Sequence, residues 1–288
     1  MSTQITTAFV QQYTGVVQML VQQKGSRLRD RVRLETLKGE YGYFDQIGAV
    51  TAVKRVSRHA DTPLTETPHS RRQVSLEDYE AADLLDKQDD IRTLIDPTNS
   101  YVQAQALAMG RAMDDAIILA ATASAKTGKT GATAVPLPAG QKIAVAATGL
   151  TLAKLLSAKE ILDAAENDPD EERYIALRAK DVTTLLNTTQ VTSSDYNTVK
   201  ALVEGKIDTF LGFKFLRTQR LITTVTPSSD TACLAWRKSG LLLAIGEDIV
   251  GDVGPRRDKS MAMQAYTKMS IGASRMEEEA VVEIAVST

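Results

Sequence analysis

Hydrophobic side chains between residues 97 and 124 recur at steps of three and four positions, the spacing of one face of an α-helix. Asp96 is a suitable N-cap, and Pro97 fits the first helical position, where a backbone N–H is not needed. The recurring positions are Val102, Ala106, Met109, Met113, either Ala116 or Ile117, and Ala120. The pattern predicts one long helix over residues 97–124, a rod of about 40 Å at about 1.5 Å per residue.

A period of two, typical of a strand, runs through residues 27–37. Leu28, Val32 and Leu34 fall on one side of this segment. The other side is basic and consists of Arg27, Arg29, Arg31 and Arg33. Such an edge suits either the phosphates of a nucleic acid or an acidic surface on another copy of the chain, and we favour the second.

A long hairpin is predicted next, with strands at residues 50–56 and 72–76 and a polar tip between them. The tip contains Pro63, Pro68 and both histidines, His59 and His69. A two-stranded ribbon with few apolar residues is only marginally stable in water. We therefore expect this hairpin to be supported by another molecule.

The other elements are mixed in order. Helices are predicted within residues 1–25, at 151–166, near Asp181 and within 192–204, and strands at 174–177, 263–271 and 280–286. The segment 205–218 reads as a turn followed by a strand, and 231–251 as a strand and a short helix. No regular strand–helix–strand alternation and no repeat is present, so the pattern favours the α+β class.

Composition is that of an ordinary globular chain of 288 residues, with 43% hydrophobic and 24% charged residues and a net charge of −2. No run is long enough for a membrane span, and the N-terminus has no secretory pattern. Cys233 is the only cysteine, which excludes an intrachain disulfide and a cysteine-based metal site. Its apolar neighbours predict a buried thiol. Neither a cofactor nor a metal is expected.

Charge is distributed unevenly. Residues 24–72 hold eleven basic and six acidic side chains, whereas residues 77–90 hold seven acidic side chains and one lysine. Opposite patches of this kind set register and partner choice when copies of a chain meet. The candidate intersubunit residues are Arg27, Arg29, Arg31, Arg33, Arg71, Arg72, Glu77, Asp78, Asp83 and Asp86.

Catalytic motifs are matched only in part. Residues 123–130 end like a phosphate-binding loop, but alanine stands at the first required glycine, and prolines follow where a helix should begin. Asp114 and Asp115 are adjacent and would point about 100° apart on a helix, which is poor for a shared site. Asp168 lies in a helix-ending turn, and Glu277–Glu279 are expected to face solvent. The sequence indicates no enzyme.

Four segments, in this order, resemble the tailed-phage major capsid proteins of the Hong Kong-97-type fold. They are "DKQDDIRTLIDPTNSYVQAQALAMGRAMDDAIILAA", "GKIDTFLGFKFLRTQRL", "WRKSGLLLAIGEDIVG" and "SIGASRMEEEAVVEIAV", the last read as a Gly-Ala-x-Arg turn that feeds the final strand. The resemblance implies an α+β capsid fold with four parts. These are an N-terminal arm (1–38), an extended β-hairpin or E-loop (39–93), a peripheral domain (94–177 and 251–288) that holds the spine helix 97–124, and a mixed α/β axial domain (178–250).

The same resemblance implies a structural protein that self-assembles into hexamers and pentamers of an icosahedral phage head and encloses double-stranded DNA. The implied partners are further copies of the chain, a portal, a decoration or cement protein, and a separate scaffolding protein, because no room for a scaffolding segment is expected before the helix. The protein would be made in the bacterial cytoplasm and end in the virion, with no membrane partner. Two alternatives stay open: an encapsulin-type compartment, and a metal-dependent hydrolase that uses Asp114, Asp115 or Asp168.

Overall fold

The computed structural model describes residues 23–58, 61–62, 64–85, 98–146, 148–165, 170–186, 209–221 and 230–287. The helices predicted within residues 1–25 and 192–204 lie outside these residues, apart from 23–25. The chain divides into two compact units. Unit 1 comprises Met1–Ser26, Asp78–Met113 and Glu247–Ser270, and unit 2 comprises Arg27–Glu77, Asp114–Gly246 and Ile271–Thr288.

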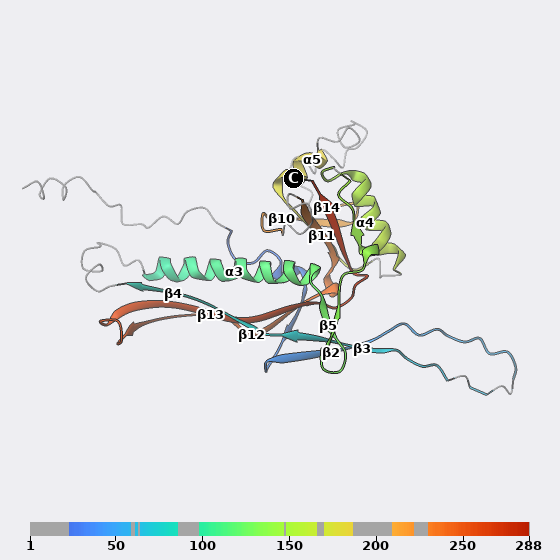
Figure 1. Cartoon of the computed structure of the whole chain (residues 1–288), viewed down its shortest axis with the longest axis horizontal. Coiled ribbons are helices and arrows are strands. Elements are labelled where there is room, and N and C mark those ends of the chain that lie inside the picture. The colour runs from blue at the N-terminus through green and yellow to red at the C-terminus, as the bar shows by residue number, and fades with distance from the viewer. Residues whose placement is uncertain are drawn as a thin grey trace, which may run out of the picture. The chain divides into compact units, whose positions relative to one another are not determined.

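The long helix predicted from the hydrophobic spacing is confirmed as α3 (Thr98–Thr122). In unit 1 it runs beside strands β4 (Glu77–Leu85), β12 (Leu241–Arg256) and β13 (Ala262–Arg275), as Figure 1 shows. The side chain of Gln105 on the helix donates to the carbonyl of Ala265 at 3.3 Å and accepts from the Thr267 hydroxyl at 2.9 Å. These two bonds attach the helix to β13, which lies between β12 and β4 in the sheet.

Unit 2 is built around a six-stranded sheet with the order β7-β14-β11-β8-β10-β9. Two antiparallel neighbours in this sheet, β11 (Thr231–Arg237) and β14 (Val281–Val286), are buried along their whole length. Around them lie β7 (Lys142–Ile143), β8 (Arg173–Leu177), β9 (Thr209–Phe210) and β10 (Phe213–Arg217). Helix α4 (Leu152–Ala164) packs near β14, and α5 (Ala179–Leu186) follows β8. The predicted helix at 151–166 and the strands at 174–177 and 280–286 are therefore confirmed.

A second sheet of unit 2 has the order β2-β3-β5-β6. Strands β2 (Tyr41–Ile47) and β3 (His69–Ser75) form an antiparallel hairpin, and β5 (Ala125–Thr127) and β6 (Thr133–Val135) complete the sheet. Between β2 and β3, the described residues 48–58, 61–62 and 64–68 leave the sheet in an extended loop, visible in Figure 1. The predicted hairpin exists, but its first strand is wrong: residues 50–56 form no strand, and Tyr41–Ile47 pairs with His69–Ser75 instead.

The strand predicted for residues 27–37 is also wrong over most of its length. A single 3-10 turn (Arg29–Arg31) precedes β1 (Arg33–Thr36), which pairs in parallel with the start of β12. Leu28 and Val32 are buried, whereas Leu34, which was expected on the same side, is exposed. The backbone departs from the extended form because the indole N–H of Trp236 donates to the Arg31 carbonyl at 3.0 Å.

The C-terminal part holds two smaller corrections. The residues read as a Gly-Ala-x-Arg turn, Gly272–Arg275, lie inside β13, and the chain turns at 276–280 instead. The short helix expected within 231–251 is a three-residue 3-10 turn, Lys238–Gly240, between β11 and β12. Unit 2 is thus a β-rich body in which long-range strand pairing dominates, and the α+β class is confirmed.

Candidate assembly surfaces

The loop of residues 48–68 exposes apolar side chains that its own chain does not cover. Val56 is 94% exposed and Leu64 is 98% exposed. Ile47, Val50 and Val53 are also exposed. Exposed apolar side chains gathered in one segment mark a protein–protein contact.

The base of this loop, in contrast, is fixed. The amide of Gly48 donates to the carbonyl of Pro68 at 2.8 Å and closes the loop. On the outer face of the hairpin, the Arg71 guanidinium pairs with Asp45 at 2.5 Å and holds the pKa of that carboxyl below its usual value. Arg71 also lies over the ring of Tyr43, 5.7 Å from its centroid.

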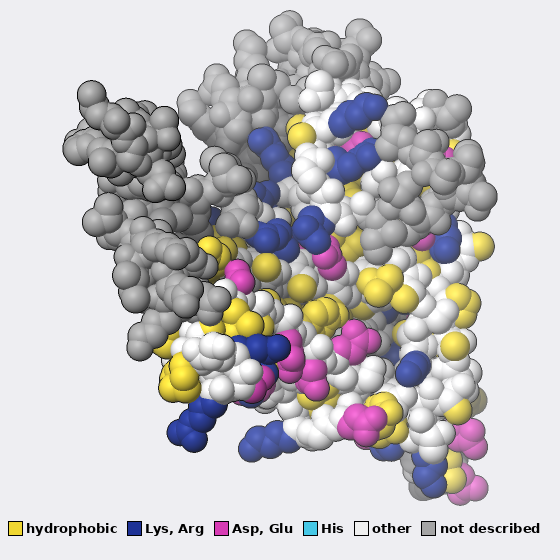
Figure 2. Space-filling view, turned by 60° about the vertical axis from the view of Figure 1, so that its left-hand side comes forward, with side chains coloured by type: hydrophobic (Ala, Val, Ile, Leu, Met, Phe, Trp, Pro, Cys, Tyr) yellow, Lys and Arg dark blue, Asp and Glu magenta, His cyan; other side chains and the backbone are white. Residues whose placement is uncertain are grey.

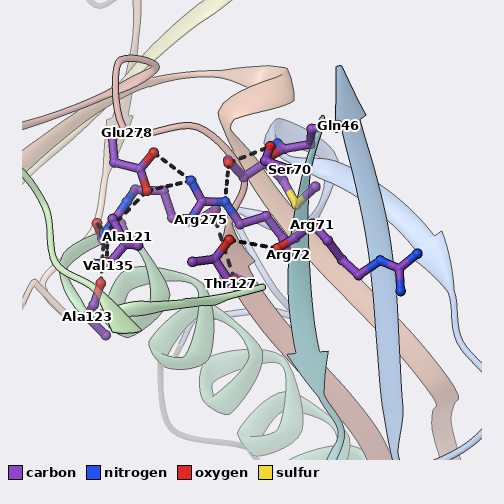
Figure 3. A network of polar contacts seen from close by, with 12 residues as sticks. Gln46, Ser70, Arg71, Arg72, Ala121, Ala123, Thr127, Val135, Arg275 and Glu278 are labelled. Carbon is purple, nitrogen blue, oxygen red and sulfur yellow. Dashed lines mark hydrogen bonds and ion pairs between the residues drawn. The ribbon is translucent and has the colours of Figure 1, made fainter. Parts of the chain in front are cut away.

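Arg72 secures the inner face of the hairpin (Figure 3). Its Nη2 donates to both oxygens of Glu278 at 2.7 and 2.6 Å, and its Nε donates to the carbonyl of Met276 at 2.9 Å. The arginine is buried and the carboxylate is mostly buried. Gln46 on β2 adds a bond from its Nε2 to the same Met276 carbonyl at 2.9 Å. The hairpin is thereby attached to the connection between β13 and β14.

Arg275, which is completely buried, extends this network to the end of α3. Its Nη1 donates to the carbonyls of Ala121 and Ala123 at 3.0 and 2.7 Å, and its Nη2 donates to Val135 at 2.9 Å. The last carbonyls of a helix have no partner within the helix, so the guanidinium satisfies them and complements the helix dipole. Burial lowers the pKa of Arg275. Figure 3 shows the two arginines on either side of Glu278.

A separate contact within unit 2 fixes the segment that begins at Arg27. The buried carboxylate of Asp114 accepts the backbone amides of Arg27 at 3.0 Å and of Leu28 at 3.1 Å. In unit 1, Gly110 lies so close to Gly25 that a side-chain carbon at 110 would be 2.5 Å from the backbone of residue 25. Glycine is therefore required where the two backbones cross.

The predicted intersubunit residues have different environments. Arg27 and Arg33 are exposed, and Arg33 pairs with Glu35 at 2.7 Å; Arg29 and Arg31 are partly buried. Arg71 and Arg72 are neighbours on β3, yet only Arg71 faces outward. The acidic residues Glu77, Asp78 and Asp83 are exposed on β4. Asp86 lies outside the described residues.

Charges of both signs are mixed on the face drawn in Figure 2. On the face drawn in Figure 2, Lys and Arg side chains lie next to Asp and Glu side chains, and hydrophobic side chains occur in small groups. The sequence predicts that Glu277, Glu278 and Glu279 face solvent. For Glu278 this prediction is wrong, because its carboxylate accepts hydrogen bonds from the buried Arg72. No sequence motif signals this pair, since its members are more than 200 positions apart.

The residues considered for catalysis have structural contacts. Asp114 holds backbone amides, and Asp115 pairs with Arg220. Asp168 lies outside the described residues. Gly128 belongs to the turn between β5 and β6 and donates its amide to the Arg71 carbonyl at 3.2 Å, so no strand-to-helix phosphate loop forms there.

Cys233 is buried as predicted, and burial raises its pKa well above the usual value. Within the described residues, no group of three His, Cys, Asp or Glu side chains is arranged to hold a metal. None of the described helices is both long and apolar enough to cross a membrane.

Comparison with known proteins identifies the class. The sequence profile of the phage capsid protein family matches residues 5–287, so the chain belongs to that family. It is a major capsid protein that forms the shell of a phage head, and phage capsid proteins are part of the virion. Comparison with curated proteins gives no match.

Solved structures with the same fold include phage capsids. The capsid protein of cyanophage P-SCSP1u superposes with a TM-score of 0.75 at 16% identity, covering 99% of this chain and 94% of that one. That of Ralstonia phage GP4 gives 0.75 at 10% identity, covering 97% and 95%. A chain in the solved structure of Mycobacterium phage Che8 gives 0.71 at 16% identity, covering 96% and 97%. The resemblance to phage capsid proteins is confirmed by these matches.

Proposed function

We propose that the loop of residues 48–68 lies on a neighbouring copy of the chain in the shell, and that this contact builds pentamers and hexamers. The main support for this contact is the near-complete exposure of Val56 and Leu64, in a loop whose base is fixed by the Arg72–Glu278 pair. Burying two such side chains at an interface contributes a few kcal/mol, at about 25 cal/mol per Å². A loop contact from one copy to the next is heterologous and closes into a ring.

Charge supports the same arrangement. Arg33 and Arg71 present basic groups and β4 presents Glu77, Asp78 and Asp83 as acidic ones. We propose that these surfaces of neighbouring copies face each other and fix the register of the ring. The division into arm (1–38), E-loop (39–93), peripheral domain (94–177, 251–288) and axial domain (178–250) belongs to the same proposal.

We further propose that the shell encloses double-stranded DNA without sequence preference, through lysine and arginine contacts that weaken with salt. A portal, a separate scaffolding protein and a decoration or cement protein are the proposed partners, and synthesis takes place in the bacterial host cytoplasm. The match to the phage capsid family favours a phage head over an encapsulin-type compartment. The structural contacts of Asp114 and Asp115 disfavour a metal-dependent hydrolase.

Assembly tests the loop contact. The double variant Val56→Lys/Leu64→Lys is compared with the matched variant Val56→Ile/Leu64→Met, each expressed with the scaffolding protein and imaged by negative-stain microscopy. The lysine variant is expected to keep the wild-type unfolding midpoint and to form no shells, while the apolar variant forms them. Normal shells from the lysine variant would refute the contact.

DNA enclosure is tested on shells recovered from infected cells. Nuclease treatment should leave DNA intact inside closed wild-type particles. Particles that are closed but never contain protected DNA would refute this part of the proposal.

A further inference from the structure

A groove opens at the base of the loop-bearing hairpin in unit 2. It has a volume of about 610 Å³ and is formed by β2, β3 and the connection between β13 and β14. Its apolar lining includes Ile47, Val135, Pro138 and Met276. Glu277, Glu278 and Glu279 line its acidic side.

The exposed charge of this groove is negative. The arginines that face these carboxylates, Arg72 and Arg237, are both buried. Glu277 is 52% exposed although it pairs with Arg237 at 2.8 Å, and Glu279 is exposed as well. The carboxylates of Glu277 and Glu279 are therefore exposed, whereas Arg72 and Arg237 are buried.

The Arg72 guanidinium also lines this groove. No acceptor for its Nη1 occurs in the part of the chain that the structure describes. A buried donor without an acceptor is costly.

The chain itself contains a segment with complementary chemistry. Residues 53–58 read Val-Lys-Arg-Val-Ser-Arg, and all six side chains are exposed. Lys54, Arg55 and Arg58 supply three positive charges, and no Asp or Glu occurs between residues 46 and 60. Val53 and Val56 supply apolar groups for a floor of the same character.

We propose that the groove receives residues 53–58 of a second copy of the chain, with Lys54, Arg55 and Arg58 facing Glu277 and Glu279. The inference rests on the proposed loop contact and names its receiving surface. The groove lies at the base of one copy's hairpin, and its occupant comes from the loop of the next copy. Every copy therefore contributes one loop segment and one groove, as a ring requires. Four residues separate Gly48 at the loop base from Val53, and an extended chain covers this interval in up to roughly 17 Å.

Cysteine cross-linking tests the pairing, because the single native cysteine, Cys233, is buried. Shells of the variant Arg55→Cys/Glu277→Cys are oxidised and analysed by denaturing electrophoresis without reductant. The expected result is a ladder of covalently linked multimers. The control variant Arg55→Cys/Glu80→Cys, with the second thiol on β4, is expected to stay monomeric.

Exchanging the charges of the loop and the groove provides a second test. It distinguishes failure of the groove proposal from failure of the loop contact. Lys54→Glu/Arg55→Glu/Arg58→Glu should abolish assembly, and combining it with Glu277→Lys/Glu279→Lys should restore shells. If the lysine variants of Val56 and Leu64 block assembly but the exchanged charges give no rescue and the cysteines do not cross-link, the loop contacts a neighbour elsewhere and the groove is wrong. If loop variants leave assembly intact, the proposed loop contact itself fails.

Discussion

The Arg72 guanidinium lies 2.6 Å from the Glu278 carboxylate, joining the hairpin strand β3 to the connection before β14. The neighbouring Arg71 makes a similar pair with Asp45, but on the exposed side of the same strand. Two adjacent arginines thus have opposite roles: one holds the hairpin to unit 2, and the other remains at the surface.

Removal of Glu278 should destabilise the protein strongly. Glu278→Ala leaves the buried Arg72 without its carboxylate, and breaking a buried pair costs about 3 kcal/mol or more. Asp45→Ala, the matched change in the exposed pair, should alter stability little because water screens that pair. Urea unfolding of the unassembled protein measures both. Equal effects of the two variants would contradict the assigned roles.

Gly272 on β13 should not tolerate a side chain. A Cβ at this position would collide with the carbonyl of Ser75 at the end of β3, and backbone atoms cannot yield cheaply. Gly272→Ala should lower the free energy of unfolding by about 2 kcal/mol, the range of overpacked interiors. Gly254→Ala on β12, where the space is open, is the control and should cause no such loss. Similar unfolding midpoints for the two variants would show that β13 and β3 are farther apart than described.

Asp114 and Asp115, adjacent on α3, should contribute unequally to the free energy of unfolding. Asp114→Ala removes the acceptor of the Arg27 and Leu28 amides and should cost about 2 kcal/mol, because buried donors are left unsatisfied. Asp115→Ala breaks only an exposed pair with Arg220 and should cost less than about 1 kcal/mol. Thermal unfolding with circular dichroism distinguishes them. A larger loss for Asp115 would overturn the anchoring of the N-terminal segment.

Cys233 should be unreactive in the folded protein. Burial, with Asp181 nearby, raises the pKa of its thiol, so the thiolate that reacts with disulfide reagents is scarce at pH 8. A thiol-reactive dye should label the unassembled protein only in urea. Prompt labelling under native conditions would mean that the core around β11 opens to solvent.

The sequence predicted best what depends on local pattern. Helix α3 begins and ends within two residues of the span read from its hydrophobic spacing, and Cys233 is buried as its neighbours indicate. Predictions failed where distant partners decide the conformation. Residues 27–37 do not form one strand because two of their backbone groups bond to distant side chains. The Arg31 carbonyl accepts from Trp236, and the Arg27 amide donates to Asp114.

The hairpin and its charges show the same limit. The valines at 50, 53 and 56 favour a strand by propensity, but none of the described strands pairs with them, and β3 pairs with Tyr41–Ile47 instead. The sequence places Arg72 among the candidate intersubunit arginines, but it cannot show that Glu278 lies beside it. The carboxylates at 277–279, read as solvent-facing, also line the groove that now defines a candidate contact.

A reconstruction of the assembled shell by electron cryomicroscopy tests the central claim most directly. The account predicts density for residues 48–68 of each copy lying on the adjacent copy, with Val56 and Leu64 covered by it. A shell in which this loop folds back onto its own chain, or extends into solvent without touching a neighbour, would contradict the account.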